Sequence, residues 1–141
     1  MQHRLQFKDF EIEDYDKIKD PVEPLCSADP DIDFSVGVNT TAVSGDIPVA
    51  CGGLLPYTND RWIAWTKISC SQLRFPIDTV KFLKKGIEIL SESMGNPIMV
   101  ALVADGFKRG HKLSLFLGFE PTDVTYDIGD KTYREYERKI G

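Results

Sequence analysis

Few side chains in this 141-residue sequence combine a reactive type with a spacing that suits chemistry. His111 can take up or release a proton near neutral pH, although most lone surface histidines have no such role. Cys26, Cys51 and Cys70 show neither a CxxC motif nor a Cys/His spacing typical of zinc ligands. Reduced thiols in a cytoplasmic protein are the simplest explanation for them. The sequence therefore predicts no metal site and makes His111 the best candidate for moving a proton.

The charge balance restricts the partners that the chain can attract. Its formal net charge is -5 and its pI is about 5.0, so no overall positive field draws it to nucleic acid. Basic residues on helices usually face solvent, which applies to Lys81, Lys84, Lys85, Lys108, Arg109 and Lys112. Acidic residues outnumber basic ones in residues 9–33. They predict a solvated face, or a surface that attracts a cationic amine or a basic protein.

Length and apolar content predict one domain, residues 1–141, that folds without disulfides or metal. The longest apolar runs, such as Ile98–Ala104, are too short to span a bilayer. The first residues alternate apolar and charged types, unlike a secretory signal. We therefore expect no membrane span and a cytoplasmic location.

Hydrophobic periodicity predicts an alternating series of strands and helices. In residues 76–94 apolar residues recur at three- and four-residue intervals, which is typical of an amphipathic helix. The apolar run in residues 97–104 predicts a strand buried on both faces. Residues 20–31 contain three prolines and are expected to form a loop. The other expected elements are strands at 4–10, 34–43, 48–57, 61–69, 119–126 and 131–140, and helices at 11–19 and 108–117.

Gly52 and Gly53 interrupt the apolar strand expected at residues 48–57. Missing side chains weaken a strand unless a bulge, or the close approach of another group, needs the room. A bulge or another packing adjustment is the simpler interpretation of both.

The order of these elements resembles the fold of the GNAT (Gcn5-related) N-acetyltransferases. Residues 98–120 resemble the fifth strand and fourth helix of that family, and Leu117-Gly118-Phe119 resembles the start of the next strand. The resemblance is clear from about Val49 onward and looser for residues 4–19. It implies an α/β (α+β) fold with a mixed, mostly antiparallel central sheet and flanking helices. It also implies transfer of an acetyl group from acetyl-CoA to an amine.

The resemblance further implies where acetyl-CoA would bind. In the family, the fourth and fifth strands splay apart and leave main-chain groups free to bind the pantetheine amides. Here those strands are residues 61–69 and 97–104. Ile68, Ala101 and Leu102 are therefore the candidate cofactor-binding residues in the two strands.

The segment that would hold the pyrophosphate departs from the family pattern. Residues 69–78 contain no glycine, so the loop cannot easily adopt the positive φ angles that turn several amides toward one anion. Arg74 could still pair with phosphate through its guanidinium, and Gln72 could donate a hydrogen bond. Asp78 adds a negative charge near the same helix end. We therefore expect a weakened acetyl-CoA site in which Gln72 and Arg74 supply the phosphate contacts.

The proton donor departs from the pattern as well. Many family members carry a tyrosine four residues before the glycine of the Leu-Gly-Phe motif, where it protonates the leaving thiolate. Ser114 occupies that position here, and its hydroxyl is shorter and a weaker acid. Ser114 and His111, one turn earlier, are the two candidate catalytic residues.

Two functions stay open on these grounds. The first is an N-acetyltransferase that uses acetyl-CoA and an amine substrate. The second follows from the strand Arg61–Trp65, which leads into a lysine-rich helix and is similar to GNAT-like proteins of short-tailed bacteriophages. That likeness implies a catalytically inactive module of the virion interior or the host cytoplasm. Its protein partner would contact the acidic N-terminal segment and Tyr126, Tyr133 and Tyr136.

Overall fold

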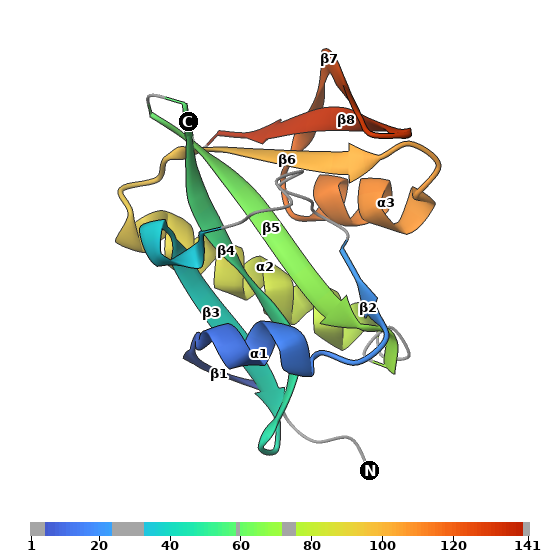
Figure 1. Cartoon of the computed structure of the whole chain (residues 1–141). Helices are drawn as coiled ribbons and strands as arrows, with labels where there is room; N and C mark the ends of the chain where they lie inside the picture. Colours follow the sequence, from blue (N-terminus) through green and yellow to red (C-terminus); the bar gives the residue numbers. More distant parts are fainter. Residues whose placement is uncertain (1–4, 24–32, 59, 72–75, 140–141) are drawn as a thin grey trace.

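The computed structural model describes residues 5–23, 33–58, 60–71 and 76–139 of the chain (Figure 1). Its elements in chain order are β1 (Leu5–Asp9), α1 (Ile12–Lys17), β2 (Pro21–Val22), η1 (Phe34–Val36), β3 (Val38–Ser44), β4 (Ile47–Thr58), β5 (Arg61–Ser69), α2 (Pro76–Ser93), β6 (Ile98–Ala104), α3 (Lys108–Phe116), β7 (Glu120–Ile128) and β8 (Lys131–Arg138). The order expected from the hydrophobic pattern is confirmed for every long element.

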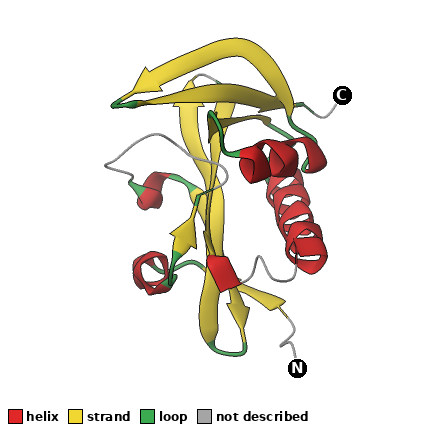
Figure 2. Cartoon of the chain, turned by 90° about the vertical axis from the view of Figure 1, so that its right-hand side faces the viewer, coloured by secondary structure: helices red, strands yellow, loops and turns green. Residues whose placement is uncertain are grey.

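All the strands of the described ranges belong to one mixed sheet. Their order is β1-β3-β4-β5-β6-β8-β7, and β2 pairs with β5 outside this path. The β5–β6 pair is parallel, and the other pairs are antiparallel. Figure 2 shows α1 on one face of the sheet and α2 and α3 on the other. The α+β class with a mostly antiparallel sheet is therefore confirmed.

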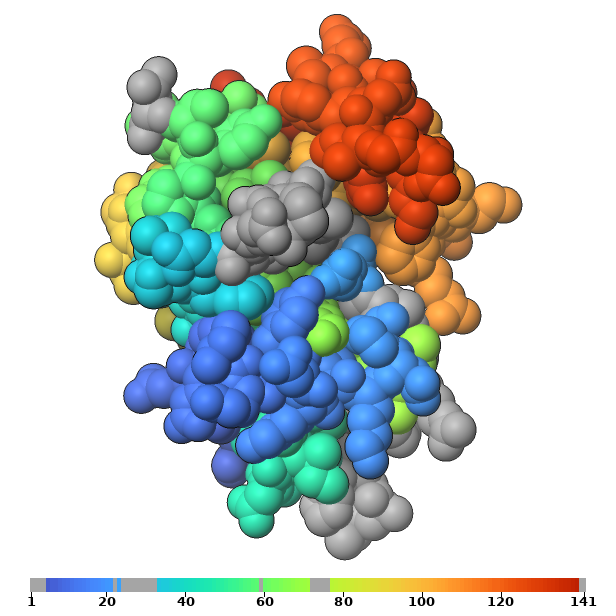
Figure 3. All heavy atoms as spheres, in the orientation of Figure 1, coloured from blue at the N-terminus to red at the C-terminus, as the bar shows by residue number. Residues whose placement is uncertain are grey.

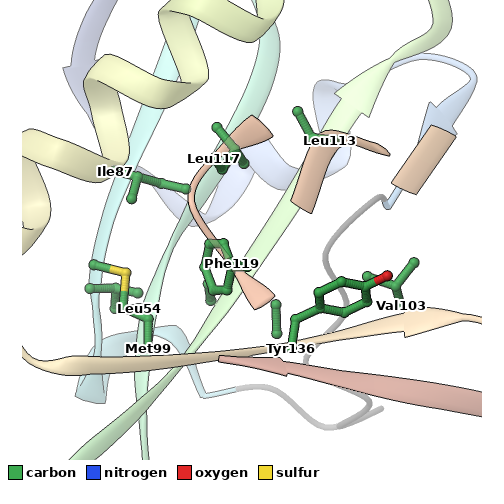
Figure 4. Close-up of a cluster of buried hydrophobic side chains, with 10 residues drawn as sticks. Leu54, Ile87, Met99, Val103, Leu113, Leu117, Phe119 and Tyr136 are labelled. Atoms are coloured by element: carbon green, nitrogen blue, oxygen red, sulfur yellow. The ribbon is translucent and has the colours of Figure 1, made fainter. Parts of the chain in front are cut away.

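The larger apolar cluster fills the space between the sheet and helices α2 and α3. Figure 4 shows Phe119 at its centre, between Leu117 and Met99. Helix α2 contributes the stripe that its periodicity predicts, with Ile87 buried and Val80, Leu83, Leu90 and Met94 packed against the cluster. Burying a side chain of this size stabilises the fold by roughly 1.5–3 kcal/mol. The cluster therefore fixes α2 and α3 against the central strands.

A second, aromatic cluster lies on the α1 face of the sheet. Trp65 of β5 is 3% exposed, and its ring centroid lies 4.8 Å from that of Phe34 and 5.9 Å from that of Tyr15. Trp62 packs into the cluster on the opposite face. The two tryptophans therefore point to opposite faces, as their three-residue spacing predicts.

Two segments differ from the sequence-based expectation. The strand expected from Phe34 begins only at Val38, because the Asp33 carboxylate accepts the Ser35 amide at 3.0 Å and starts a 3-10 turn over Phe34–Val36. The expected proline loop contains the short strand β2, whose residues Pro21 and Val22 pair with β5. Proline lacks a donor but is tolerated on an edge strand, which is where β2 lies.

The acidic N-terminal segment is only partly the solvated face that its composition predicts. Asp14 is fully buried, and its carboxylate accepts hydrogen bonds from the Glu11 amide at 2.9 Å and the Thr41 hydroxyl at 2.8 Å. The Lys8 ammonium pairs with it at 3.1 Å. Burial alone would raise the pKa of Asp14, but these donors outweigh it and lower the pKa. Asp14 therefore ties α1 to β1 and β3.

The two strand glycines leave room for neighbouring main chain. A Cβ atom on Gly52 would lie 2.7 Å from the Trp65 carbonyl oxygen, and one on Gly53 would meet the Val38 carbonyl oxygen. The register irregularities of β4 lie elsewhere, beside Val43 and after Pro56. Close approach of the adjacent strands, rather than a bulge at this position, accounts for both glycines.

Replacement of Gly118 by valine is expected to lower Tm by roughly 10 °C, because Gly118 has φ +94° and a β-branched residue resists that conformation by about 1–3 kcal/mol. An added Cβ would also lie 3.2 Å from Arg138 Nε, which donates to the Leu117 carbonyl. Thermal unfolding measures the effect. Gly45→Val separates the two causes, because Gly45 also has a positive φ, +64°, but open space around it, so its loss of Tm measures the backbone strain without the contact to Arg138. Equal melting temperatures for Gly118→Val and the parent would contradict the prediction.

Candidate functional site

Strands β5 and β6 form a V-shaped opening in the sheet. Arg61–Ile63 pairs with Ile98–Val100, and beyond these residues no β5–β6 pairing occurs in the part of the chain that the structure describes. The two strands diverge toward their carboxyl ends in Figure 1. Ala64–Lys67 and Ala101–Ala104 therefore present main-chain edges that are not paired with each other. Such edges can bind an extended chain of amides by strand-like hydrogen bonds.

Ala101 and Leu102 lie on this open edge of β6, where the sequence placed them. On the other edge of β6 they pair with Tyr136 and Glu135 of β8. Both side chains are buried, one on each face of the sheet. Only their main-chain groups can therefore reach a ligand in the opening, and their binding role stays a prediction.

Ile68 is placed differently from the expectation. It lies opposite Ala50 of β4 and also opposite Val22 of β2. Because β4 occupies one edge of β5, β2 must lie on the edge that faces the opening. The Cys70 amide just beyond donates to the Asp20 carbonyl oxygen at 3.0 Å. The main chain at the carboxyl end of β5 is therefore already paired within the chain.

His111 lies at the carboxyl end of β6 and is held on both sides. Its Nε2 is 3.1 Å from the Ala104 carbonyl oxygen, and its Nδ1 is 2.6 Å from the Tyr136 hydroxyl. A carbonyl oxygen only accepts, so Nε2 carries a hydrogen, and Nδ1 of the neutral ring accepts from Tyr136. The resulting chain of hydrogen bonds runs from Tyr136 through His111 to the end of β6.

Tyr136 is a functional candidate that the sequence reasoning assigned to another role. It was expected on a contact surface, but it is 5% exposed and belongs to the large apolar cluster (Figure 4). Burial raises the pKa of Tyr136; nearby Arg134 opposes this effect and Asp105 adds to it. The phenol therefore keeps its proton at neutral pH and donates it in the hydrogen bond to His111. Tyr136 and His111 are 25 positions apart in the sequence, so no local sequence pattern reveals their contact.

Ser114 is poorly placed for proton transfer. Its side chain is fully buried in α3, and its hydroxyl donates to the Gly110 carbonyl oxygen at 2.9 Å. A serine that bonds back to its own helix fills a structural role. Gln72 and Arg74, the candidate phosphate ligands, lie outside the described residues.

A buried polar cluster joins the amino-terminal end of β5 to the β7–β8 hairpin. Glu135 is 4% exposed and accepts from Arg61 at 3.3 Å, Thr122 at 3.1 Å and Tyr126 at 3.0 Å. Tyr126 also accepts from the Tyr57 hydroxyl. Since Arg61 starts the short β5–β6 pairing, this cluster fixes the vertex of the opening.

In the described ranges, neither the buried thiol nor the acidic side chains offer a competing site. Burial raises the pKa of the Cys51 thiol to about 12, against the opposing effect of Lys67, so Cys51 is not a nucleophile at neutral pH. Among the described residues, no three His, Cys, Asp or Glu side chains gather as metal ligands. In the same ranges no helix has the length and apolar character that crossing a membrane requires.

Comparison with known proteins identifies the fold. No protein-family model and no curated protein matches the sequence. Solved structures do match: a GCN5-related N-acetyltransferase from Kribbella flavida has a TM-score of 0.69 and 15% identity over 96% of this chain and 98% of that one. A Bacillus subtilis acetyltransferase in complex with CoA has a TM-score of 0.67 and 14% identity over 98% and 99%. A GNAT family acetyltransferase from Elizabethkingia anophelis with acetyl-CoA bound has a TM-score of 0.61 and 11% identity over 86% and 99%. The chain therefore has the GNAT acetyltransferase fold.

Proposed function

We propose that the chain binds an acyl-CoA thioester between β5 and β6 and transfers its acyl group, acetyl in the simplest case, to an amine. The observation that carries this proposal is the opening itself, where two parallel strands separate after three paired positions. Parallel strands buried on both faces normally stay paired along their length, because unpaired buried main-chain groups are costly. The CoA and acetyl-CoA complexes among the neighbours support the same occupant.

The residues present fit an acyl-CoA in part. Ala64–Lys67 and Ala101–Ala104 offer main-chain groups for the pantetheine amides. Helix α2 begins at Pro76, beyond the carboxyl end of β5, and the unpaired amides and partial positive charge of a helix start favour phosphate. Arg74 and Gln72 precede this helix start in the sequence. We assign the phosphate contacts to them.

The proposed reaction needs a proton donor near the leaving thiolate. When bound, an acyl-CoA would supply a thioester carbonyl for attack by an amine that has lost its extra proton to solvent. The C–N bond forms, the C–S bond breaks, the thiolate leaves, and the second proton lost by the nitrogen also goes to solvent. Tyr136 lies opposite Ala101 on the edge of β6 that pairs with β8, and its hydroxyl reaches His111, which bonds to the Ala104 carbonyl oxygen at the carboxyl end of β6. Tyr136 can deliver one proton, and His111 can replace it after its Nδ1 has taken up a proton from solvent. They take the role that Ser114, bonded to Gly110, cannot fill.

We propose that the acceptor is an amine that carries a positive charge in solution. The exposed carboxylates of Glu11, Glu13 and Asp16 lie on or beside α1, on the sheet face opposite α2 and α3 (Figure 2). Carboxylates of this kind raise the local concentration of cations at low ionic strength.

A catalytically inactive GNAT-fold module is the alternative function. The pairing of β2 with Ile68 and Ser69 favours it, because it covers part of the edge that an acyl-CoA would use. The viral setting and the protein partner suggested by the sequence have no counterpart among the neighbours named above. They stay hypotheses attached to this alternative.

Calorimetric titration with coenzyme A and acetyl-CoA tests the proposal. We expect binding by the wild type, and about ten- to one-hundred-fold weaker binding by Arg74→Ala, since a paired guanidinium–phosphate contact is worth about 1.5–3 kcal/mol. Lys84→Ala is the matched control, because Lys84 is exposed on α2 and its ammonium lies over the Phe116 ring. Absence of binding by the wild type would favour the inactive module. Equal weakening by both substitutions would show general charge attraction instead of a phosphate site.

A further inference from the structure

Strand β2 occupies the part of β5 that would continue the open edge. Pro21 and Val22 lie opposite Ser69 and Ile68, and the Cys70 amide donates to the Asp20 carbonyl oxygen. Without β2, the stretch of β5 that pairs with neither β2 nor β6 would extend from Ala64 to Ser69, about 20 Å instead of about 13 Å at the usual rise per residue. Figure 1 shows β2 beside the carboxyl end of β5, on the side of α3. The segment therefore shortens the open edge of β5 from the end that precedes helix α2.

Several features weaken the pairing between β2 and β5. The strand has only two residues, and Pro21 has no amide hydrogen to donate. Asp20, which precedes it, has φ +46°, a left-handed conformation that is unfavourable for residues other than glycine. Asp20, Pro21 and Glu23 are all exposed. Short pairings at the surface open at low free energy while the rest of the fold stays intact.

The segment is nevertheless tethered where it leaves α1. Ile18 is 4% exposed and packs in the aromatic cluster. The Lys67 ammonium donates to the Tyr15 carbonyl oxygen at 2.6 Å and lies 3.7 Å from the centroid of the Tyr15 ring. The Tyr15 hydroxyl in turn donates to the Glu23 carboxylate at 2.9 Å. The space-filling view shows the blue N-terminal part covering the lower half of this face (Figure 3).

We infer that residues 19–23 form a displaceable strap, which closes the carboxyl end of the β5 edge and leaves it when acyl-CoA binds. This inference rests on the proposed function, because it takes acyl-CoA as the competitor for the edge. Ile18 stays fixed in the core, and Lys19 and Asp20 absorb the movement. The exposed hydrogen bond between Tyr15 and Glu23 acts as a latch. Acyl-CoA binds only the molecules whose strap is open. The apparent affinity for acyl-CoA is therefore lower than that of the open form, in proportion to the fraction of molecules that are open.

A reversible crosslink tests the strap. Pro21→Cys and Ser69→Cys place two thiols at directly opposed positions, in a background with Cys26→Ser and Cys70→Ser that removes competing thiols. We expect the oxidised protein to bind coenzyme A at least about tenfold more weakly than the same protein after reduction. Equal affinity of the two forms would overturn the strap and leave the proposed function standing. If the reduced protein and the wild type both fail to bind, the proposed function falls instead.

Hydrogen exchange tests the strap independently of any ligand. In the wild-type protein, the Cys70 amide bonded to Asp20 is expected to exchange at least about 100-fold faster than the amides that join β4 to β5 around Leu54 and Ala64. Comparable protection of both sets would show that β2 is a permanent strand of the sheet. That result would overturn the inference whether or not coenzyme A binds.

Discussion

Replacement of Asp14 by asparagine is expected to lower the free energy of unfolding by about 2–4 kcal/mol, since hydrogen bonds to a buried charged group are worth about 1.5–3 kcal/mol and stranded donors add to the loss. The Asp14 carboxylate is fully buried and accepts from Glu11, Thr41 and Lys8. Asparagine has nearly the same volume as aspartate, but its side-chain amide NH2 is a donor and would face the donors that bond to the carboxylate. Denaturant unfolding of both proteins measures the difference.

The difference in stability between wild type and Asp14→Asn should depend on pH. The pKa of Asp14 is lowered in the fold, so its contribution is complete above the unfolded value near pH 4 and is lost as pH falls through the lower folded value. The stability gap between wild type and Asp14→Asn should therefore be constant near pH 7 and shrink below about pH 4. Asp16→Asn is the control, because Asp16 is exposed on the same helix. A gap that does not change with acidification would show that Asp14 acts by packing and not by charge.

The sequence was informative wherever local pattern decides structure. The helix at Pro76–Ser93 and the strand at Ile98–Ala104 have strong periods, because one packs a single stripe and the other is buried on both faces. The positive φ of Gly118 could likewise be expected, since it ends a helix in the Leu-Gly-Phe motif. In each case the determining residues lie within one element.

The sequence was much less informative about groups that depend on partners far along the chain. The sequence predicted Asp14 to be one of many solvated acids, whereas it is fully buried and bonds to Thr41, 27 residues away. Glu135 depends in the same way on Arg61. The three prolines of residues 20–31 argued against a strand, and β2 exists only because β5 offers an open edge. For the candidate site, the resemblance implied the separation of β5 and β6, and the sequence named His111, whose catalytic role stays a prediction. No local pattern joined Tyr136 to His111 or paired Pro21 and Val22 with β5.

The final prediction separates the candidate proton donors. If the proposed function holds, Tyr136→Phe and His111→Gln should each lower kcat for acetyl-CoA by about 100-fold, the lower end of the usual range for general acid catalysis. The KM for acetyl-CoA should change little, because neither side chain lies on the strand edges assigned to the pantetheine. Ser114→Ala is the control. Its buried hydroxyl contacts Gly110 within the same helix, so kcat should stay within about twofold while stability falls by about 1 kcal/mol.

A second substrate distinguishes proton donation from a structural effect of these substitutions. An acetyl thioester of an acidic aryl thiol releases a thiolate that is stable without a proton, so a missing proton donor should matter little. We therefore expect Tyr136→Phe and His111→Gln to match the wild type within a few-fold on this thioester, while both remain about 100-fold slower on acetyl-CoA. Equal losses on both thioesters would mean that the Tyr136–His111 contact at 2.6 Å only holds α3 against β8. If Ser114→Ala instead loses most of its kcat while Tyr136→Phe and His111→Gln stay active, the proton donor is Ser114 in α3.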